Sequence, residues 1–292
     1  MSEEETNHTL TLQDGRTLGF AEYGDNSSQK AVFHFNGSGG SRLEHPTDKL
    51  ILSDLGLRFI ATDRPGHGLS SPQPERKLLD WPDDISELAN HLNADRFYVM
   101  GWSGGGPHAL ACAYKLPERV IAGAIISGLA PFDRPNPYDG LPLTLKILNF
   151  LGRKSPSLVY LFRRLMRPML MGDPEEAGKK LASSFPPVDR QLAEQPENQK
   201  MLVASIQEGY KQGREGPAQD DIVINSPWGF QLEDIGIRID IWQGEVDKNV
   251  PLIQGKYQHE KIPISTFTVM PEQAHLYLLA NWRNVLERLV AE

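Results

Sequence analysis

The sequence predicts an α/β protein with a mostly parallel central sheet flanked by helices. Short runs of strand character alternate with amphipathic helical patterns along most of the 292 residues. Strands that alternate with helices pair in parallel through right-handed crossovers. Residues suited to catalysis follow several of these strands, at the edge where a parallel sheet gathers its ligands.

The composition fits one large α/β domain, or such a domain with an insertion. Hydrophobic residues make up 39% of the chain, and no stretch approaches the apolar length of a membrane span. The acidic start, 1–5, is unlike a signal peptide, and the single Cys112 is expected to be a buried small residue. We therefore expect a soluble, cytoplasmic protein. Its net charge of −8 argues against a nucleic-acid partner.

The first half of the chain predicts six strands. Residues 8–13 and 17–23 alternate like strands, and Asp14-Gly15 between them favours a hairpin turn. The elements that follow are a strand at 31–35, a helix at 47–56, a strand at 58–62, a helix at 78–93, a strand at 96–100, a helix at 107–116 and a strand at 120–126.

After the sixth strand the pattern changes. The chain becomes proline-rich near residue 131, and no strand pattern returns until about Ile235. We expect a helical cap at 129–225, inserted between two parts of the α/β core at 1–128 and 226–292. The second part predicts a strand at 237–242, a helix ending near 261, a strand at 264–270 and a last helix at 276–290.

One cap helix is expected to face the active site. In 157–167 the apolar residues follow a 3.6-residue period, and Pro168 ends or kinks the run. Leu161 and Phe162 on this stripe are predicted to bind substrate.

The surrounding segment is strongly basic. It carries six basic residues and no acidic one from Gly140 to Gly172, which could also mark a membrane-surface helix or an anionic substrate. We favour an insertion that covers the core with its apolar face while the arginines stay in water. No stable membrane association is expected.

The sharpest motif is Gly101-Trp102-Ser103-Gly104-Gly105, between a strand and a helix. A serine at such a corner takes a strained backbone conformation, so its neighbours two before and two after must be small. The amide of Gly104 points from a helix N-terminus toward anything that Ser103 attacks. Trp102 is expected to border the substrate.

Two other interpretations of this stretch are weaker. It could be a plain glycine-rich turn, or the dinucleotide pattern G-x-G-x-x-A at 104–109. A dinucleotide site needs an acidic residue after the next strand, which instead ends in Ser127-Gly128. A phosphate loop would need a lysine that is missing. We therefore expect no cofactor.

Three residues complete a catalytic set. Ser103, Asp247 and His275 each follow a strand of the parallel sheet, in the order Ser, Asp, His. An imidazole can take the serine proton, and a carboxylate on its other nitrogen fixes the tautomer. Glu245 competes with Asp247 but lies closer to the strand end. No metal-ligand spacing occurs, so no metal is expected.

These motifs resemble the α/β-hydrolase fold superfamily along nearly the whole chain. Besides the nucleophile motif, the segments 244–251 and 274–275 match the family's acid loop and histidine, and 63–70 matches a recurrent loop. The resemblance implies that Ser38 gives a second oxyanion amide beside Gly104. The family usually has His-Gly-x-Pro-Gly here, where this chain has Asn36-Gly37-Ser38-Gly39-Gly40.

The sequence thus predicts a serine hydrolase that cleaves an ester, thioester, lactone or amide of a small-molecule substrate through an acyl-enzyme. A serine nucleophile disfavours the epoxide hydrolases and dehalogenases of the superfamily, which use aspartate. A cofactor-free lyase or perhydrolase with the same triad, and a ligand-binding receptor with a slow triad, stay open. The motifs assign no oligomeric state.

Overall fold

The computed structural model describes residues 6–48 and 50–291. Within this part of the chain, one sheet has the order β1-β2-β4-β3-β5-β6-β7-β8. The β1–β2 and β2–β4 pairs are antiparallel and all later pairs are parallel. The strands are β1 (His8–Thr11), β2 (Thr17–Gly24), β3 (Ala31–Phe35), β4 (Arg58–Thr62), β5 (Phe97–Trp102), β6 (Val120–Ile126), β7 (Arg238–Gly244) and β8 (Ser265–Met270).

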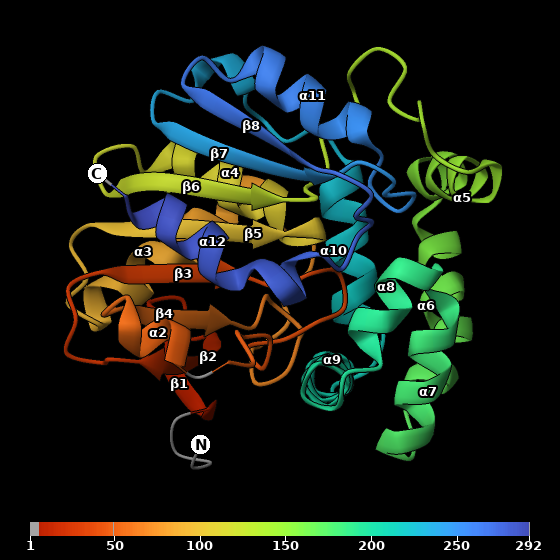
Figure 1. The fold of residues 1–292 in the computed structure, drawn as a ribbon, viewed down its shortest axis with the longest axis horizontal. Helices are drawn as coiled ribbons and strands as arrows, with labels where there is room; N and C mark the ends of the chain where they lie inside the picture. The colour runs from red at the N-terminus through yellow and green to blue at the C-terminus, as the bar shows by residue number, and fades with distance from the viewer. Residues whose placement is uncertain (1–5, 49, 292) are drawn as a thin grey trace.

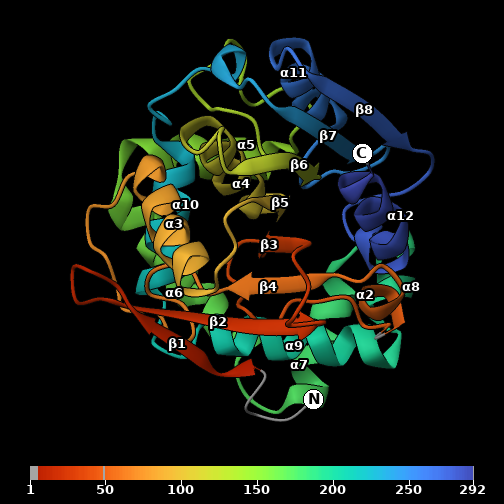
Figure 2. The same cartoon turned by 90° about the vertical axis from the view of Figure 1, so that its left-hand side faces the viewer.

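Helices cover both faces of this sheet (Figures 1 and 2). The core helices are α2 (Leu50–Asp54), α3 (Trp81–His91), α4 (Gly106–Lys115), α11 (Leu252–Lys261) and α12 (Leu278–Val290), with short 3₁₀ turns η1 (Leu78–Asp80), η2 (Ser103–Gly105) and η3 (Leu232–Asp234). Neighbouring residues of β5 show the two layers, because Val99 packs with the α3 and α4 side and Met100 with the α2 and α12 side. Both faces of the central strands are therefore buried, as expected of a parallel sheet.

Between β6 and β7 the described chain forms only helices, which we call the cap. They are α5 (Leu143–Lys154), α6 (Pro156–Leu170), α7 (Pro174–Ser184), α8 (Pro187–Ala193), α9 (Pro196–Gly209) and α10 (Glu215–Asn225). Figure 1 shows them beyond the carboxyl ends of the parallel strands, with α5, α6 and α7 farthest from the sheet. None of the helices in the described ranges is long and apolar enough to cross a membrane.

The orientation of α6 corrects the sequence-based expectation. Pro168 lies inside this helix, which continues to Leu170. Its apolar stripe faces outward: the exposed fractions are 38% for Leu158, 50% for Leu161 and 68% for Leu165. The 3.6-residue period correctly predicts an amphipathic helix, but a period does not say which neighbour covers the apolar side.

Candidate active site

Ser103 lies at a tight corner between β5 and α4. Its φ of 53° is in the left-handed region, which residues other than glycine rarely adopt. A Cβ on Gly101 would collide with the carbonyl of Gly105, and a Cβ on Gly105 with the carbonyl of Phe35. The two glycines therefore allow the turn to pack against β3, and the serine is held at the carboxyl end of its strand.

His275 and Asp247 meet at the same edge of the sheet, from the loops after β8 and β7. Nδ1 of His275 lies 2.8 Å from Oδ2 of Asp247. The other carboxylate oxygen accepts the backbone N–H groups of Asn249 at 2.8 Å and Val250 at 2.9 Å. The two backbone N–H groups thus fix the carboxylate, and its other oxygen keeps the proton of the imidazole on Nδ1. Nε2 is left free to accept one.

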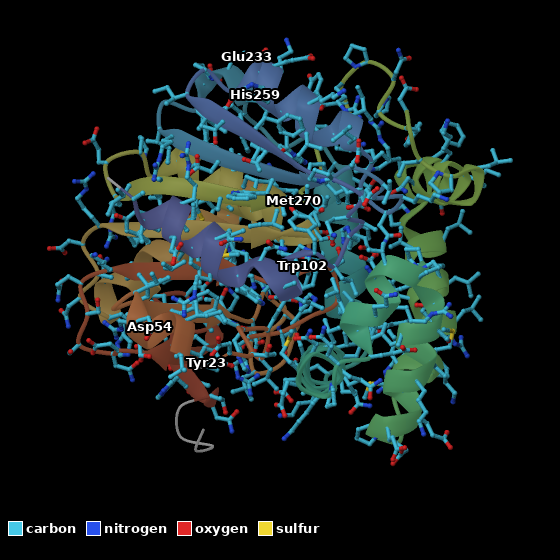
Figure 3. All side chains as sticks on the ribbon, in the orientation of Figure 1. Tyr23, Asp54, Trp102, Glu233, His259 and Met270 are labelled. Atoms are coloured by element: carbon cyan, nitrogen blue, oxygen red, sulfur yellow. The ribbon has the colours of Figure 1, made fainter. Side chains whose placement is uncertain are left out.

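The backbone of His275 is held from both the core and the cap. The indole of Trp102 donates to its carbonyl at 3.3 Å, and Figure 3 places Trp102 where the sheet meets the cap. Asp189 of α8 accepts the N–H groups of His275 at 3.0 Å and Leu276 at 2.8 Å. A cap residue therefore helps to set the position of the imidazole.

The charges around His275 favour its protonated form. Burial by itself lowers the pKa of the imidazole, but the charge and hydrogen bond of Asp247 outweigh this effect. The charges of Asp189 and Glu44 act in the same direction as Asp247, and the pKa of His275 is raised above its usual value.

Glu245, the competing acid, points elsewhere. Its side chain is exposed and accepts the backbone N–H of Glu272 at 2.9 Å. Glu245 therefore braces the loop that leads to His275 and makes no contact with the ring among the described hydrogen bonds.

Ser103 and His275 line one hollow of about 140 Å³. No hydrogen bond joins the serine to the imidazole in the described part of the chain, and free enzymes commonly tighten this contact only when substrate binds. The other lining residues are Gly37, Ser38, Gly40, Glu44, Trp102, Phe185, Leu202, Ser205, Ile206 and Leu276.

The cap contributes a different set of residues from the one predicted. Leu161 and Phe162 do not line this hollow, and Leu161 is half-exposed on the outward side of α6. Phe185 after α7 and three residues of α9 (Leu202, Ser205 and Ile206) occupy that place. Trp102, which was predicted to border the substrate, and Ser38, which was predicted to donate an oxyanion amide, both line the hollow. Nothing in the spacing of the α9 residues separates them from ordinary core positions.

The loop after β3 brings Ser38 against Gly104. A Cβ on Gly104 would collide with the hydroxyl of Ser38 and lie 3.2 Å from its amide nitrogen. The carbonyl of Gly37 belongs to the same peptide unit as the Ser38 N–H. It accepts hydrogen bonds from the Asn36 side chain at 3.0 Å and the Gly40 N–H at 3.1 Å.

A third donor to this peptide unit is Arg64. Its Nη2 donates to the Gly37 carbonyl at 3.1 Å and its Nη1 to the Asn36 carbonyl at 2.7 Å. A peptide plane fixes the N–H direction once the carbonyl is fixed. The atypical loop is therefore held in one orientation by its own asparagine and by a buried arginine.

Arg64 is itself oriented by the cap. Asp220 of α10 accepts its Nε at 2.8 Å, and both side chains are fully buried. Arg76 donates to the other oxygen of Asp220 at 2.8 Å, and Nε2 of His108 lies 3.5 Å away. Although burial by itself raises the pKa of Asp220, the charges of Arg64 and Arg76 outweigh this effect, the pKa is lowered and the carboxyl stays ionised.

The two histidines near this cluster are poor candidates for the base. Burial lowers the pKa of His67 and of His108 to about 3. The charge of Asp220 would raise these pKa values, but the charges of Arg64 and Arg76 lower them further. Both rings are neutral at ordinary pH, and neither lines the hollow. Within residues 6–48 and 50–291, no group of three or more metal-ligating side chains is positioned to hold an ion.

Three features together define the class of the protein. They are the strand order of the sheet, the serine at the tight turn after β5 and the histidine in the loop after β8. The chain belongs to the α/β-hydrolase fold family, whose model matches residues 31–279.

Curated relatives match only in part. The chain is 33% identical over 116 residues to a probable proline iminopeptidase of Leptolyngbya boryana, covering 39% of this chain and 35% of that one. It is 28% identical over 165 residues to 2-hydroxy-6-oxononadienedioate/2-hydroxy-6-oxononatrienedioate hydrolase 1 of Pseudomonas putida, covering 53% and 56%. The matched regions thus span from about a third to just over half of these relatives.

Solved structures match the fold along the whole chain. A hydrolase from Pseudomonas aeruginosa superposes with a TM-score of 0.71 at 19% identity, covering 98% of each chain. The enol-lactonase from Burkholderia xenovorans superposes with a TM-score of 0.70 at 17% identity, covering 98% of this chain and 100% of that one. At these identities the likeness concerns the fold.

Proposed function

We propose that this protein is a serine hydrolase that cleaves an ester, thioester, lactone or amide of a small molecule through an acyl-enzyme. The observation that carries this proposal is the shared hollow of Ser103 and His275, with the imidazole held 2.8 Å from Asp247. The names of the relatives, which include an iminopeptidase and a lactonase, support acyl transfer without choosing a substrate.

Each residue has a defined task in this reaction. Nε2 of His275 takes the proton of Ser103 as the oxygen attacks the substrate carbonyl, and Asp247 stabilises the imidazolium. The amides of Ser38 and Gly104 donate to the oxyanion. The imidazolium then protonates the leaving group, and a water activated by the same ring releases the acid and frees the serine.

The size of the hollow favours a short acyl group. Its 140 Å³ is small beside the roughly 300–1,000 Å³ of pockets for drug-sized ligands, and most of its larger side chains are apolar. We propose that α9 of the cap, through Leu202 and Ile206, sets the acyl length. Acetyl and butyryl p-nitrophenyl esters should therefore turn over faster than the octanoyl ester.

A fluorophosphonate probe tests the nucleophile. It should label the protein once, because among the described residues Ser103 carries the one hydroxyl for which we propose both a base and an oxyanion site. Ser103→Ala should abolish labelling and nearly all ester turnover while the circular dichroism spectrum is unchanged. Labelling that persists in this variant would refute the assignment.

Two further measurements separate the alternatives. A receptor with a slow triad would be labelled but would not turn over p-nitrophenyl esters at a useful rate. Dialysis against a chelator should leave turnover unchanged, since the proposed chemistry needs no metal; a loss restored by a divalent ion would contradict the mechanism.

A further inference from the structure

The cap carries an apolar surface that no described part of the chain covers. On α6, Leu158, Leu161, Leu165 and Met169 recur at intervals of three and four residues, and their exposed fractions lie between 38% and 68%. Leu143 and Ile147 of α5 are exposed at 72% and 51%. We call these six residues the outward face. Both helices lie on the side of the cap away from the sheet (Figure 1).

Polar contacts on the opposite side fix α6 in this orientation. Arg163 donates to both oxygens of Asp221 on α10 and, at 2.7 Å, to the hydroxyl of Tyr210. Tyr160 donates to Gln219 of α10 at 3.2 Å. The helix cannot roll to bury its apolar stripe without breaking the ion pair of Arg163 and Asp221. The outward face is therefore a stable feature of the folded protein, and such a face marks an interaction site.

A basic hollow lies beside the outward face. It is lined by Arg164, Arg167, Lys211 and Arg214, with Glu215 as its one acidic residue, and has a volume of about 410 Å³. Two of these residues belong to the turn of α6 that also carries Leu165 and Met169. Arg164 precedes Leu165 and borders the apolar stripe, whereas Arg167 follows Arg163 by one turn and lies on the side of α6 that faces α10. The hollow therefore adjoins the stripe along the flank of the helix that carries Arg164.

Carboxylates neutralise this hollow only in part. Lys211 lies 3.3 Å from Glu208, and Arg214 lies 3.6 Å from Glu215. Among the described residues, neither Arg164 nor Arg167 has a carboxylate partner, and the buried Nε atoms of Arg167 and Arg214 make no hydrogen bond. The hollow has unused donors and a net positive charge, which together suit a phosphate group.

We propose that the outward face and the basic hollow dock this protein on an anionic phospholipid surface. Apolar side chains that enter the acyl region beside arginines that meet phosphates are the arrangement of an interfacial helix. The charge distribution supports this partner, because the segment from Gly140 to Gly172 has six basic residues and no acidic one within a chain of net charge −8. One helix face gives reversible binding, which is compatible with the expectation of no stable membrane association.

The same charges disfavour the other occupants. A two-fold pair of copies would bring two basic segments together, since a two-fold interface uses the same patch on both subunits. A soluble phosphate would leave the apolar stripe unexplained.

Vesicle sedimentation tests the proposal with the full chain. Vesicles of phosphatidylcholine mixed with phosphatidylglycerol should bind the protein, and pure phosphatidylcholine vesicles should bind it far more weakly. Replacing both Arg164 and Arg167 by Gln should weaken binding to the anionic vesicles roughly 25-fold, at about fivefold for each charge. Raised salt should weaken the binding of the parent protein as well.

The apolar part is tested separately. Leu165→Ser with Met169→Ser should weaken vesicle binding by about tenfold or more, because less apolar area enters the lipid. Leu50→Ser is the matched control, since Leu50 is 65% exposed on α2, outside the outward face, and its loss should leave binding unchanged. Equal thermal midpoints of all variants show that folding is intact.

Three results would overturn the proposal. Absence of binding to anionic vesicles would exclude a lipid partner. Vesicle binding that survives both double variants would place the contact elsewhere. Self-association of the parent protein that the Leu165 and Met169 replacements abolish, without vesicle binding, would identify a second copy as the occupant. Calorimetric titration with glycerol phosphate distinguishes a soluble ligand, because its binding would need the arginines and not the apolar residues.

Discussion

At the scale of single residues, the contacts of Asp247 predict what an isosteric change would do. One carboxylate oxygen accepts two backbone N–H groups and the other meets Nδ1 of His275. In Asp247→Asn the amide oxygen should stay with the backbone donors, so the NH₂ group would face Nδ1. The ring would then carry its proton on Nε2 and could not accept one from Ser103. We expect turnover to fall by about 10⁴, or roughly 5 kcal/mol of barrier.

Glu245→Gln is the matched control for this change. Its side-chain oxygen can still accept the Glu272 N–H, so activity on the same activated ester should fall by less than about tenfold. Both variants should show the parental thermal midpoint. A collapse in Glu245→Gln together with near-parental activity in Asp247→Asn would reverse the assignment of the acid.

The raised pKa of His275 predicts the acid limb of the pH profile. Protonated imidazole cannot act as a base, so kcat/KM should rise with pH through a midpoint above the ordinary histidine value of about 6.5. Asp189→Asn removes one of the charges that raise this pKa and should move the midpoint to lower pH. A pH midpoint that is unchanged, or that moves to higher pH, would show that the charge of Asp189 does not raise the pKa of the ring.

At the scale of elements, the loop after β3 depends on Arg64 for its orientation. Arg64→Lys keeps the charge near Asp220 but loses the planar fork that reaches two carbonyls. The Ser38 amide, which we propose donates to the oxyanion, would then be less accurately aligned. Loss of one oxyanion donor costs about 10²–10³ in kcat, and a misaligned one should cost about 10-fold to 100-fold. KM should change little, since the contact forms in the transition state.

Arg76→Lys provides the matched control. Arg76 pairs with the same carboxylate and is also buried, but its other described contact is the Pro65 carbonyl and not the loop after β3. Its replacement should lower thermal stability about as much as Arg64→Lys while kcat stays near parental. Equal kcat losses in the two variants would mean that Arg64 acts only through stability.

The elements also show where sequence patterns suffice and where they fail. The strand at 120–126 was predicted with its observed bounds, and the helix at 107–116 within one residue, because local periodicity and glycine or proline signals define such segments. The proposed triad of Ser103, Asp247 and His275 could be selected from the sequence for a related reason, since each residue follows a strand of the parallel sheet.

The residues that sequence analysis missed act across long separations. Asp189 meets the His275 backbone 86 residues away, and Asp220 meets Arg64 from 156 residues away. Neither acid stands in a motif, and both lie in helices where a charged residue is ordinarily on the surface. The sequence also did not predict which side of α6 faces the core, because this depends on the contacts of α6 with the neighbouring helix α10.

At the scale of the whole molecule, buried contacts between cap and core predict a single cooperative unit. Asp220 and Asp189 lie in the cap, and the partners that they hold lie in the core. Asp220→Asn would leave Arg64 and Arg76 buried without a counter-charge, at a cost of about 3–5 kcal/mol. The midpoint of thermal unfolding should fall by roughly 10 °C. Tryptophan fluorescence and circular dichroism should still report one shared transition, because cap and core are joined at more than one point.

Asp221→Asn is the control that shows whether the loss of any carboxylate on α10 lowers the thermal midpoint as much as Asp220→Asn does. Asp221 pairs with Arg163 of α6, so its partner lies within the cap, and the pair is partly exposed. Its replacement should lower the midpoint by less than Asp220→Asn does, since water screens the uncompensated arginine. Two resolved transitions in the Asp220 variant, with ester turnover lost at the first, would instead describe a cap that unfolds alone. The position of His275 would then depend on a cap that folds and unfolds independently of the core.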